Sequence, residues 1–192
     1  REGEAFLSKA NIVNDARVDG RRSWRATLDD GTRKHDASVE TGDGSDPTRR
    51  DYRFNLAPYE VDKMLGLNLV TPSVERVVNG RPASVTWWVD NVGMDEEDRI
   101  KKGVSGPNPG RTTLQLTTMR VFDELIQNKD RNQGNILWTK DWTLWLIDHR
   151  RPLRLGRELL GPDRLVRIDR DLLARLRALT PESVSAAAGD SL

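Results

Sequence analysis

The sequence contains no cysteine and only two histidines, His35 and His149, among its 192 residues. Without cysteine, disulfide bonds and thiolate metal sites are excluded. The two histidines are too far apart in the sequence to form a zinc site unless carboxylates contribute. The lack of cysteine leaves the cellular compartment open.

The chain also lacks a long hydrophobic run and an excess of one charge. No apolar segment approaches the roughly 20 residues that span a bilayer, and no signal peptide is visible, so we expect no membrane span. The 31 Lys and Arg residues against 30 Asp and Glu give a net charge of +1. This balance supplies no electrostatic argument for nucleic acid binding. Because the sequence begins with Arg1 rather than Met, we expect that an N-terminal segment is missing.

Turn signals organise the first half of the chain. The hydrophobic content of 36% suffices for a packed core in one large domain or in two small lobes. The pairs Asp30-Gly31 and Asn79-Gly80 each separate two extended runs, and such pairs favour tight hairpin turns. The sequence therefore predicts two β-hairpins, over residues 22–40 and 73–89.

Helical spacing of apolar residues is found in three further segments. The first runs from residue 52 to 65 and ends at Gly66, with a kink or a new start expected near Pro58. The others are predicted over residues 114–126 and 165–179. The remaining segments lack periodicity: a flexible loop is predicted at 41–47, a surface loop or linker at 94–111, and a frayed end at 186–189.

The most informative stretch runs from Asn128 to Leu137 and is followed by the apolar run 142–147 and Asp148. Phosphoryl transfer needs a carboxylate that orients or deprotonates the acceptor, and oxygen ligands that hold Mg²⁺ against the phosphates. Asp130, Asn135 and Asp148 supply such groups. Asp130 lies five residues before Asn135, the interval between Asp and Asn in the catalytic-loop pattern H-R-D-x-x-x-x-N.

A hairpin is predicted to bring two of these residues together. Residues 136–138 form one strand, 139–141 the turn, and 142–147 the return strand. This hairpin would place Asp148 beside Asn135. The alternative interpretation is a polar loop in which Asn and Gly satisfy turn geometry and Asp148 caps the following segment.

The stretch resembles the catalytic and metal-binding segments of atypical kinases, in the pattern N-x-D-R-N-x-G-N-[IL]-L followed by [LV]-W-[LM]-I-D-H. These are the HipA-like kinases, the phosphoinositide 3-/4-kinases and the secretory-pathway kinases related to four-jointed. The chain more closely resembles an uncharacterised bacterial branch of that superfamily. The resemblance covers roughly residues 20–182 and includes segments 50–55, 65–76 and 85–90.

The resemblance implies an α+β, two-lobed, protein-kinase-like fold. Residues 1–91 would form a small N-lobe rich in antiparallel strands, and residues 92–192 a mainly helical C-lobe with the catalytic and metal-binding loops. Asp130 would be the catalytic aspartate, with Arg131 and Asn132 supporting its loop.

The same resemblance implies an ATP site with Mg²⁺, or with Mn²⁺ as the alternative. Asn135 and Asp148 would be the metal ligands. The segment from Asp15 to Arg22, with Gly20, would form the turn that covers the phosphates. Backbone groups around Trp88 and Val89 would contact adenine at the hinge between the lobes; the alternative for the paired tryptophans is core packing.

One departure from the kinase pattern concerns the phosphate-positioning ion pair. Active protein kinases place a Lys on the third strand and pair it with a Glu on the next helix. Here Glu40 and Asn55 stand at those positions. The sequence leaves three compensations open: an Arg such as Arg25 or Arg53, a second cation bridging Glu40 to the phosphates, or another orientation of the nucleotide.

Several functions remain open on these residues. The first is an ATP- and Mg²⁺-dependent phosphotransferase whose acceptor is a protein, a lipid or a small molecule. The second is a pseudokinase or nucleotide-binding interaction module without turnover, and a variant is a nucleotidyl transferase that binds ATP in the flipped orientation. A metal-stabilised scaffold without nucleotide is the third.

Overall fold

The computed structural model describes residues 2–15, 22–42, 51–129, 131–149, 158–165 and 167–188. Asp130, Gly20 and most of the predicted 41–47 loop lie outside these ranges. Across the described residues, no helix combines the length and the apolar character needed to cross a membrane.

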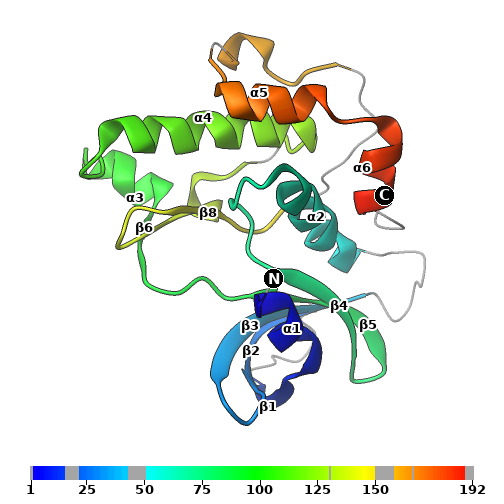
Figure 1. The fold of residues 1–192 in the computed structure, drawn as a ribbon. Coiled ribbons are helices and arrows are strands. Elements are labelled where there is room, and N and C mark those ends of the chain that lie inside the picture. The colour runs from blue at the N-terminus through cyan, green and yellow to red at the C-terminus, as the bar shows by residue number, and fades with distance from the viewer. Residues whose placement is uncertain are drawn as a thin grey trace.

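The N-terminal part is an antiparallel sheet of five strands in the order β1-β2-β3-β5-β4 (Figure 1). Helix α1 lies across this sheet. Both predicted hairpins are confirmed, as β2–β3 and β4–β5. The elements are α1 (Glu2–Lys9), β1 (Asn11–Asp15), β2 (Ser23–Asp29), β3 (Lys34–Thr41), β4 (Ser73–Val78) and β5 (Arg81–Trp87).

The hairpin turns have the chemistry that their residues favour. Asn79 and Gly80 adopt left-handed φ values of 52° and 75°, which a two-residue turn of this type requires at both positions. In the other turn the Asp30 carboxylate accepts hydrogen bonds from the Thr32 amide at 2.9 Å and the Arg33 amide at 2.8 Å. The hydrogen bond from the Thr32 hydroxyl, and after it those from the two amides, lower the pKa of Asp30. Local side-chain chemistry therefore sets both turns.

The two faces of the sheet differ in polarity. Alternate residues of β2, β3 and β5 pack against α1 in a core of eleven buried residues. Helix α1 was not predicted, because its short apolar pattern becomes meaningful only against the sheet. The core residues are Phe6, Leu7, Ala10, Trp24, Ala26, Leu28, Ala37, Val39, Val78, Ala83 and Val85. The opposite face carries polar side chains that include Thr27, Asp36, Ser38, Glu40 and Ser84.

Strand β5 is shorter than predicted. It ends at Trp87, so Trp88 and Val89 lie beyond it rather than within a strand to residue 89. The Trp88 amide still donates to the Asp36 carbonyl at 3.1 Å. The left-handed φ of 53° at Asn91 then turns the chain.

Pro58 lies in the first turn of a new helix, as the sequence predicted. A 3₁₀ turn, η1 (Asp51–Phe54), precedes α2 (Leu56–Leu65). In the first turn the missing amide of Pro58 breaks no helical hydrogen bond. Gly66 ends the helix with a φ of 61°, a conformation that glycine adopts without penalty.

The C-terminal part combines helices with a second, three-stranded sheet of order β6-β7-β8. Its core also includes Tyr59, Val61 and Leu65 of α2. The predicted domain boundary near residue 91 stays a prediction. The elements are β6 (Val92–Asp95), α3 (Glu96–Lys101), α4 (Pro109–Leu125), η2 (Gln133–Asn135), β7 (Ile136–Thr139), β8 (Leu144–Leu146), η3 (Pro162–Arg164), α5 (Arg170–Arg177) and α6 (Pro181–Ala188).

The prediction of a loop over residues 94–111 was wrong in its first half, which forms the end of β6 and helix α3. It was also wrong at residues 109–111, because α4 starts at Pro109, ahead of the helix start predicted at residue 114. The charges of this segment are satisfied by specific partners. Glu96 is buried, accepts from Trp138 Nε1 at 2.7 Å and pairs with Arg99. The Asp95 carboxylate caps α3 through the Asp98 amide at 2.8 Å. The buried contact of Glu96 with Trp138 is the part of this arrangement that no local pattern indicates.

Two further boundaries differ. Helix α5 starts at Arg170 after its N-cap Asp169, so the helix predicted from residue 165 is shorter. The predicted frayed end was wrong for residues 186–188, which belong to α6. Thr180 and Ser183 exchange hydrogen bonds at the start of α6 and support it.

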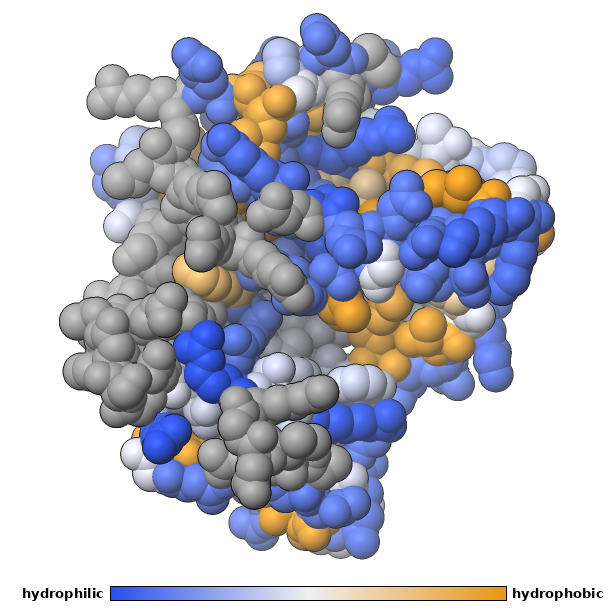
Figure 2. Space-filling view, turned by 180° about the vertical axis from the view of Figure 1, so that it is seen from behind, coloured by the Kyte–Doolittle hydropathy of each residue, from blue (hydrophilic) through white to orange (hydrophobic). Residues whose placement is uncertain are grey.

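The face shown in Figure 2 has no single dominant hydrophobic band where described residues form it. On the face turned away from Figure 1, hydrophilic residues predominate and hydrophobic ones lie in separate patches (Figure 2). This view therefore gives no extended docking face.

A carboxylate on α1 connects it to α2. Glu4 Oε1 accepts hydrogen bonds from Lys63 Nζ at 2.6 Å and from Tyr59 Oη at 2.9 Å. Burial alone would raise the pKa of Glu4, but the hydrogen bonds and the charge of Lys63 hold it at about 2, against an ordinary value of 4.5. The ionised carboxylate is therefore favoured by the folded state.

We expect Glu4→Gln to lower the melting temperature at pH 7 by about 2 °C, the equivalent of roughly 0.5–1 kcal/mol for a partly exposed pair. A depressed folded pKa stabilises above the unfolded value and loses that effect as pH falls. The difference from wild type should thus shrink between pH 4.5 and about 2. Thermal unfolding across this pH range measures it.

Glu97→Gln is the matched control, because Glu97 pairs with Lys101 on the exposed surface of α3. It should leave the melting temperature within about 1 °C of wild type. An equal loss in both variants would show that the Glu4 contact has no special effect.

Candidate functional site

The base of the β7–β8 hairpin brings Asn135 and Asp148 together. Ile136 pairs with Leu146, and the Ile147 amide donates to the Asn135 carbonyl at 3.1 Å. Asn135 Nδ2 then donates to Asp148 Oδ2 at 3.4 Å. The predicted juxtaposition is confirmed, whereas the return strand is limited to residues 144–146.

Asp148 is exposed and has an unusual backbone conformation. Its φ is 50°, in the left-handed region that non-glycine residues rarely adopt, although Asp does so more readily than most. Such a conformation persists only where surrounding contacts impose it and is concentrated at functional sites. The carboxylate is thus directed by the hairpin rather than by local preference.

Arg131 supplies the contacts that fix this region. Its guanidinium donates to the Asp123 carboxylate from Nη2 at 2.8 Å and from Nε at 3.0 Å. Its Nη1 donates to the Ile147 carbonyl at 3.1 Å. Only 9% of the Arg131 side chain and 12% of the Asp123 side chain are exposed. One guanidinium therefore joins α4 to the residue that precedes Asp148.

Asp123 was missed by sequence reasoning. It is a buried carboxylate on α4, next to Phe122 in an otherwise apolar pattern, and it also accepts from Asn128 Nδ2 at 3.0 Å. An acid on the buried surface of a helix implies a partner, because buried charges are paired. That signal was present in the sequence, but it did not identify Arg131 as the partner.

Asn132 has a local structural role. Its Oδ1 accepts from the Gly134 amide at 2.8 Å and caps the 3₁₀ turn η2. This is the turn geometry that the alternative interpretation of the motif expected. A role of Asn132 in catalysis stays a prediction.

His149 follows Asp148 and is buried with its ring edge-on to Phe122, 6.3 Å between centroids. Burial, and secondarily the charge of Arg131, hold the pKa of His149 well below its ordinary value. The imidazole is therefore neutral at pH 7. Its Nε2 makes no hydrogen bond within the described part of the chain.

On the polar face of the N-terminal sheet, Glu40 and Asn55 contact each other. Asn55 Nδ2 donates to Glu40 Oε2 at 2.8 Å and to Ser84 Oγ at 3.1 Å. Glu40 comes from β3, and Asn55 immediately precedes α2. The two residues predicted to stand at the kinase Lys and Glu positions thus contact each other, as a neutral donor and a carboxylate.

The two predicted adenine-contacting residues differ in environment. Trp88 is 37% exposed, and the Arg25 guanidinium lies 4.5 Å from its ring centroid. Arg25 also donates from Nε to Asp36 at 2.8 Å. Val89 is buried. The structure therefore places Trp88 at the surface near the polar face and Val89 inside.

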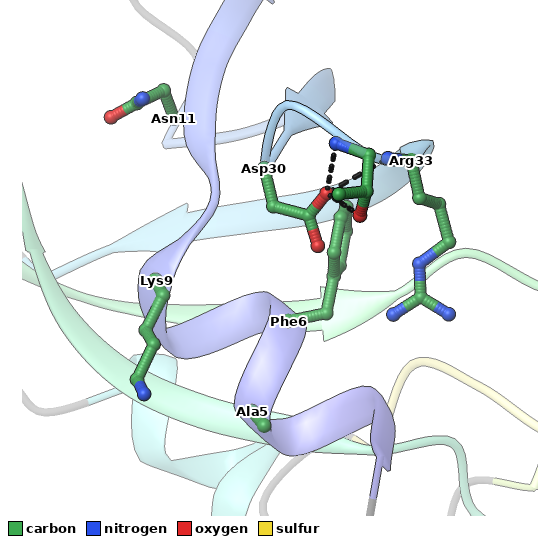
Figure 3. Close-up of a pocket in the computed structure, with 7 residues that line it drawn as sticks. Ala5, Phe6, Lys9, Asn11, Asp30 and Arg33 are labelled. Atoms are coloured by element: carbon green, nitrogen blue, oxygen red, sulfur yellow. Dashed lines mark hydrogen bonds between the residues drawn. The ribbon is translucent and has the colours of Figure 1, made fainter.

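A cavity with a volume of about 580 Å³ lies between α1 and the β2–β3 turn (Figure 3). Phe6 and Lys9 of α1 line one side, and Asp30 and Arg33 the other. None of the predicted site residues is among the described residues that line it. This cavity is separate from the motif.

The donor set of the motif fits a hard cation. Mg²⁺ prefers carboxylate and amide oxygens and keeps several waters, so two protein ligands and nucleotide phosphates suffice. The Asn135 amide nitrogen faces Asp148, so the amide would have to rotate for its oxygen to bind a cation together with Asp148. Within the described ranges, no group of three or more His, Asp or Glu side chains gathers around one point.

Removal of the Asp123 carboxylate should be costly. In Asp123→Ala the Arg131 guanidinium stays buried without its partner, and such a change costs about 3–5 kcal/mol. Urea unfolding would measure the loss. The double variant Asp123→Ala/Arg131→Met removes both charges and should recover part of it; a double variant less stable than the single one would contradict this pairing.

Comparison with solved structures shows the fold. The crystal structure of the Helicobacter pylori proinflammatory kinase CtkA matches with a TM-score of 0.55 and 12% identity, over 94% of this chain. This chain spans 66% of the CtkA chain.

Two variants of the Mycobacterium tuberculosis PknI kinase domain match more weakly, with TM-scores of 0.42 and 0.43 at 10% identity. These matches cover 73% of this chain and 59% and 60% of theirs. No family model matches the chain, and no curated protein matches its sequence. At this identity the likeness to CtkA shows the fold alone: the chain is α+β with a kinase-like fold.

Proposed function

We propose that the protein is an ATP- and Mg²⁺-dependent phosphotransferase. The observation that carries the proposal is the contact between Asn135 and Asp148 at the base of the β7–β8 hairpin, within a kinase-like fold. Asn135 and Asp148 would hold the metal ion, which when bound neutralises phosphate charge. The acceptor is a hydroxyl of a protein, a lipid or a small molecule.

Asp130 would orient the acceptor hydroxyl. It is the neighbour of Arg131, whose guanidinium is held by Asp123 and by the Ile147 carbonyl. This support constrains the chain on both sides of the proposed reaction centre, since Ile147 precedes Asp148. Correct relative placement of such groups contributes much of the catalysis in phosphoryl transfer.

A second candidate is a pseudokinase or nucleotide-binding interaction module without turnover. The hydrogen bond between Glu40 and Asn55 favours it, because these positions lack the cation that positions phosphates in active protein kinases. Trp88 and Val89 would contact adenine in either case. Nucleotidyl transfer by ATP in the flipped orientation is compatible with the same pair.

Two of the compensating cations considered above already have partners. Arg25 pairs with Asp36, and Arg53 Nη2 lies 3.8 Å from Glu75 Oε1. If either arginine bound the phosphates of ATP, its contact with Asp36 or Glu75 would be broken. This supports a bridging cation near Glu40, or another nucleotide orientation, over a substitute arginine.

We expect ATP with Mg²⁺ or Mn²⁺ to raise the melting temperature of the wild type, because a ligand that binds only the folded state stabilises it. Asp148→Asn should abolish the metal-dependent part of that shift without loss of the fold. Thermal-shift titrations with and without metal measure both effects.

Asp141→Asn is the matched control, since Asp141 lies at the opposite end of the same hairpin and bonds Thr143. It should retain the metal-dependent shift. Asp130→Ala should also retain it while losing transfer from labelled ATP. An unchanged shift in Asp148→Asn would remove Asp148 from the metal site, and full transfer in Asp130→Ala would reject its assigned role.

The double variant Glu40→Lys/Asn55→Glu tests the equivalence with the kinase ion pair. Asn55 Nδ2 and Glu40 Oε2 are 2.8 Å apart. The lysine introduced on β3 can therefore donate to the glutamate introduced just before α2. We expect ATP affinity to rise by about tenfold through the added cation. Isothermal titration measures it, and a folded variant with unchanged or weaker affinity would contradict the equivalence.

A further inference from the structure

A second cavity lies beside the linker that follows β5. Its volume is about 370 Å³, and its lining includes Arg33, Trp87, Val89, Asp90 and Trp145. Arg33 lies in the β2–β3 turn and Trp87 ends β5, whereas Trp145 belongs to β8. Residues from both the N-terminal part and the C-terminal sheet therefore line this cavity.

This cavity and Trp88 lie on opposite faces of the N-terminal sheet. Trp87 packs with Phe6 of α1, 5.7 Å between ring centroids, whereas Trp88 contacts Arg25, whose side chain is on the polar face. Successive residues of an extended chain point to opposite sides. The cavity thus lies on the side of the sheet away from Trp88, and Val89 is the residue that it shares with the proposed adenine contacts.

Two indole rings form the apolar walls. Trp87 is held in place by His35, which stacks on it with 3.6 Å between centroids. Trp145, half-buried on β8, supplies the other indole. Because His35 already covers one face of Trp87, a ligand would contact the remaining indole surface. Indole walls favour a flat aromatic ligand over a flexible one, because aromatic contact adds to the burial of apolar area.

The polar groups at the cavity carry opposite charges. Asp90 is oriented by His35, whose Nε2 lies 2.7 Å from Asp90 Oδ2, and its side chain remains 61% exposed. The second oxygen of Asp90 is an acceptor for a ligand N–H. The Arg33 guanidinium lies over Phe6 at 4.4 Å and Trp87 at 5.2 Å. Because the negative charge of Asp90 and the positive charge of Arg33 both lie at the cavity, a ligand without net charge is favoured.

Close backbone approach bounds the cavity on the α1 side. A Cβ added at Gly3 would lie 3.1 Å from Pro72 Cγ and 3.4 Å from Trp87 Cε3. Glycine at this position lets α1 pack directly against the cavity wall. The volume of about 370 Å³ is near the lower end of small-molecule sites, which limits the ligand to about two rings.

We propose that this cavity is a binding site for a small, neutral, planar aromatic molecule of one or two rings that carries an N–H donor. The rings would pack against Trp87 and Trp145, and the N–H would donate to Asp90. The site does not depend on the proposed phosphotransferase activity.

Isothermal titration of the whole chain with indole, without nucleotide or metal, tests the site. We expect saturable binding that weakens by about tenfold or more in Asp90→Ala, since a hydrogen bond to a charged group is lost. Trp145→Ala should weaken it similarly. The probe 1-methylindole, which has the same rings and no N–H, should bind the wild type more weakly than indole does.

Trp88→Ala is the matched control, because Trp88 is on the other side of the sheet and should not alter indole affinity. Asp90 is largely exposed, so Asp90→Ala tests the proposal even where Trp145→Ala fails to fold. The site is rejected by absence of indole binding at millimolar concentration, by equal affinity in Asp90→Ala, or by loss of binding in Trp88→Ala.

Discussion

The ion pair between Asp123 and Arg131 is the contact on which the arrangement of the candidate site depends. Both side chains are largely buried, and the guanidinium also binds the Ile147 carbonyl. A buried charge is stable only when paired and hydrogen-bonded. This requirement couples α4, the loop after Asp130 and the end of β8, so the position of Asp148 relative to the loop follows from one charged contact. The neutral, buried His149 packs beside it against Phe122.

The N-terminal sheet contributes a polar face whose centre departs from the usual kinase chemistry. Glu40 and Asn55 meet there, with Ser84 as a third partner. An acid at this position repels phosphate unless a cation lies between them. The chain has a kinase-like fold. If Glu40 and Asn55 take the place of the phosphate-positioning pair, the proposed enzyme and the proposed binding module differ mainly in how the charge of Glu40 is compensated.

Much of the local structure was predictable because it depends on neighbouring residues. Asn79-Gly80 formed the expected turn, and Gly66 ended the predicted helix. The hairpin brought Asp148 back to Asn135 as expected, because its strands and turn are formed by consecutive residues and their lengths can be predicted from the sequence. The structure of charged segments was harder to predict. Glu96 forms a buried ion pair with Arg99, and no local pattern distinguishes Glu96 from a solvated acid.

The sequence by itself determined the two hairpins of the N-terminal sheet, the C-terminal end of α2 and the juxtaposition of Asn135 with Asp148, since short-range backbone preferences set each of them. Only the tertiary structure decided that α1 covers one face of the sheet, that Asp123 holds Arg131, and that Glu40 meets Asn55. Those contacts join residues that are distant in sequence or belong to separate elements. Their partners are selected by burial, which requires each apolar face to be covered and each buried charge to be paired.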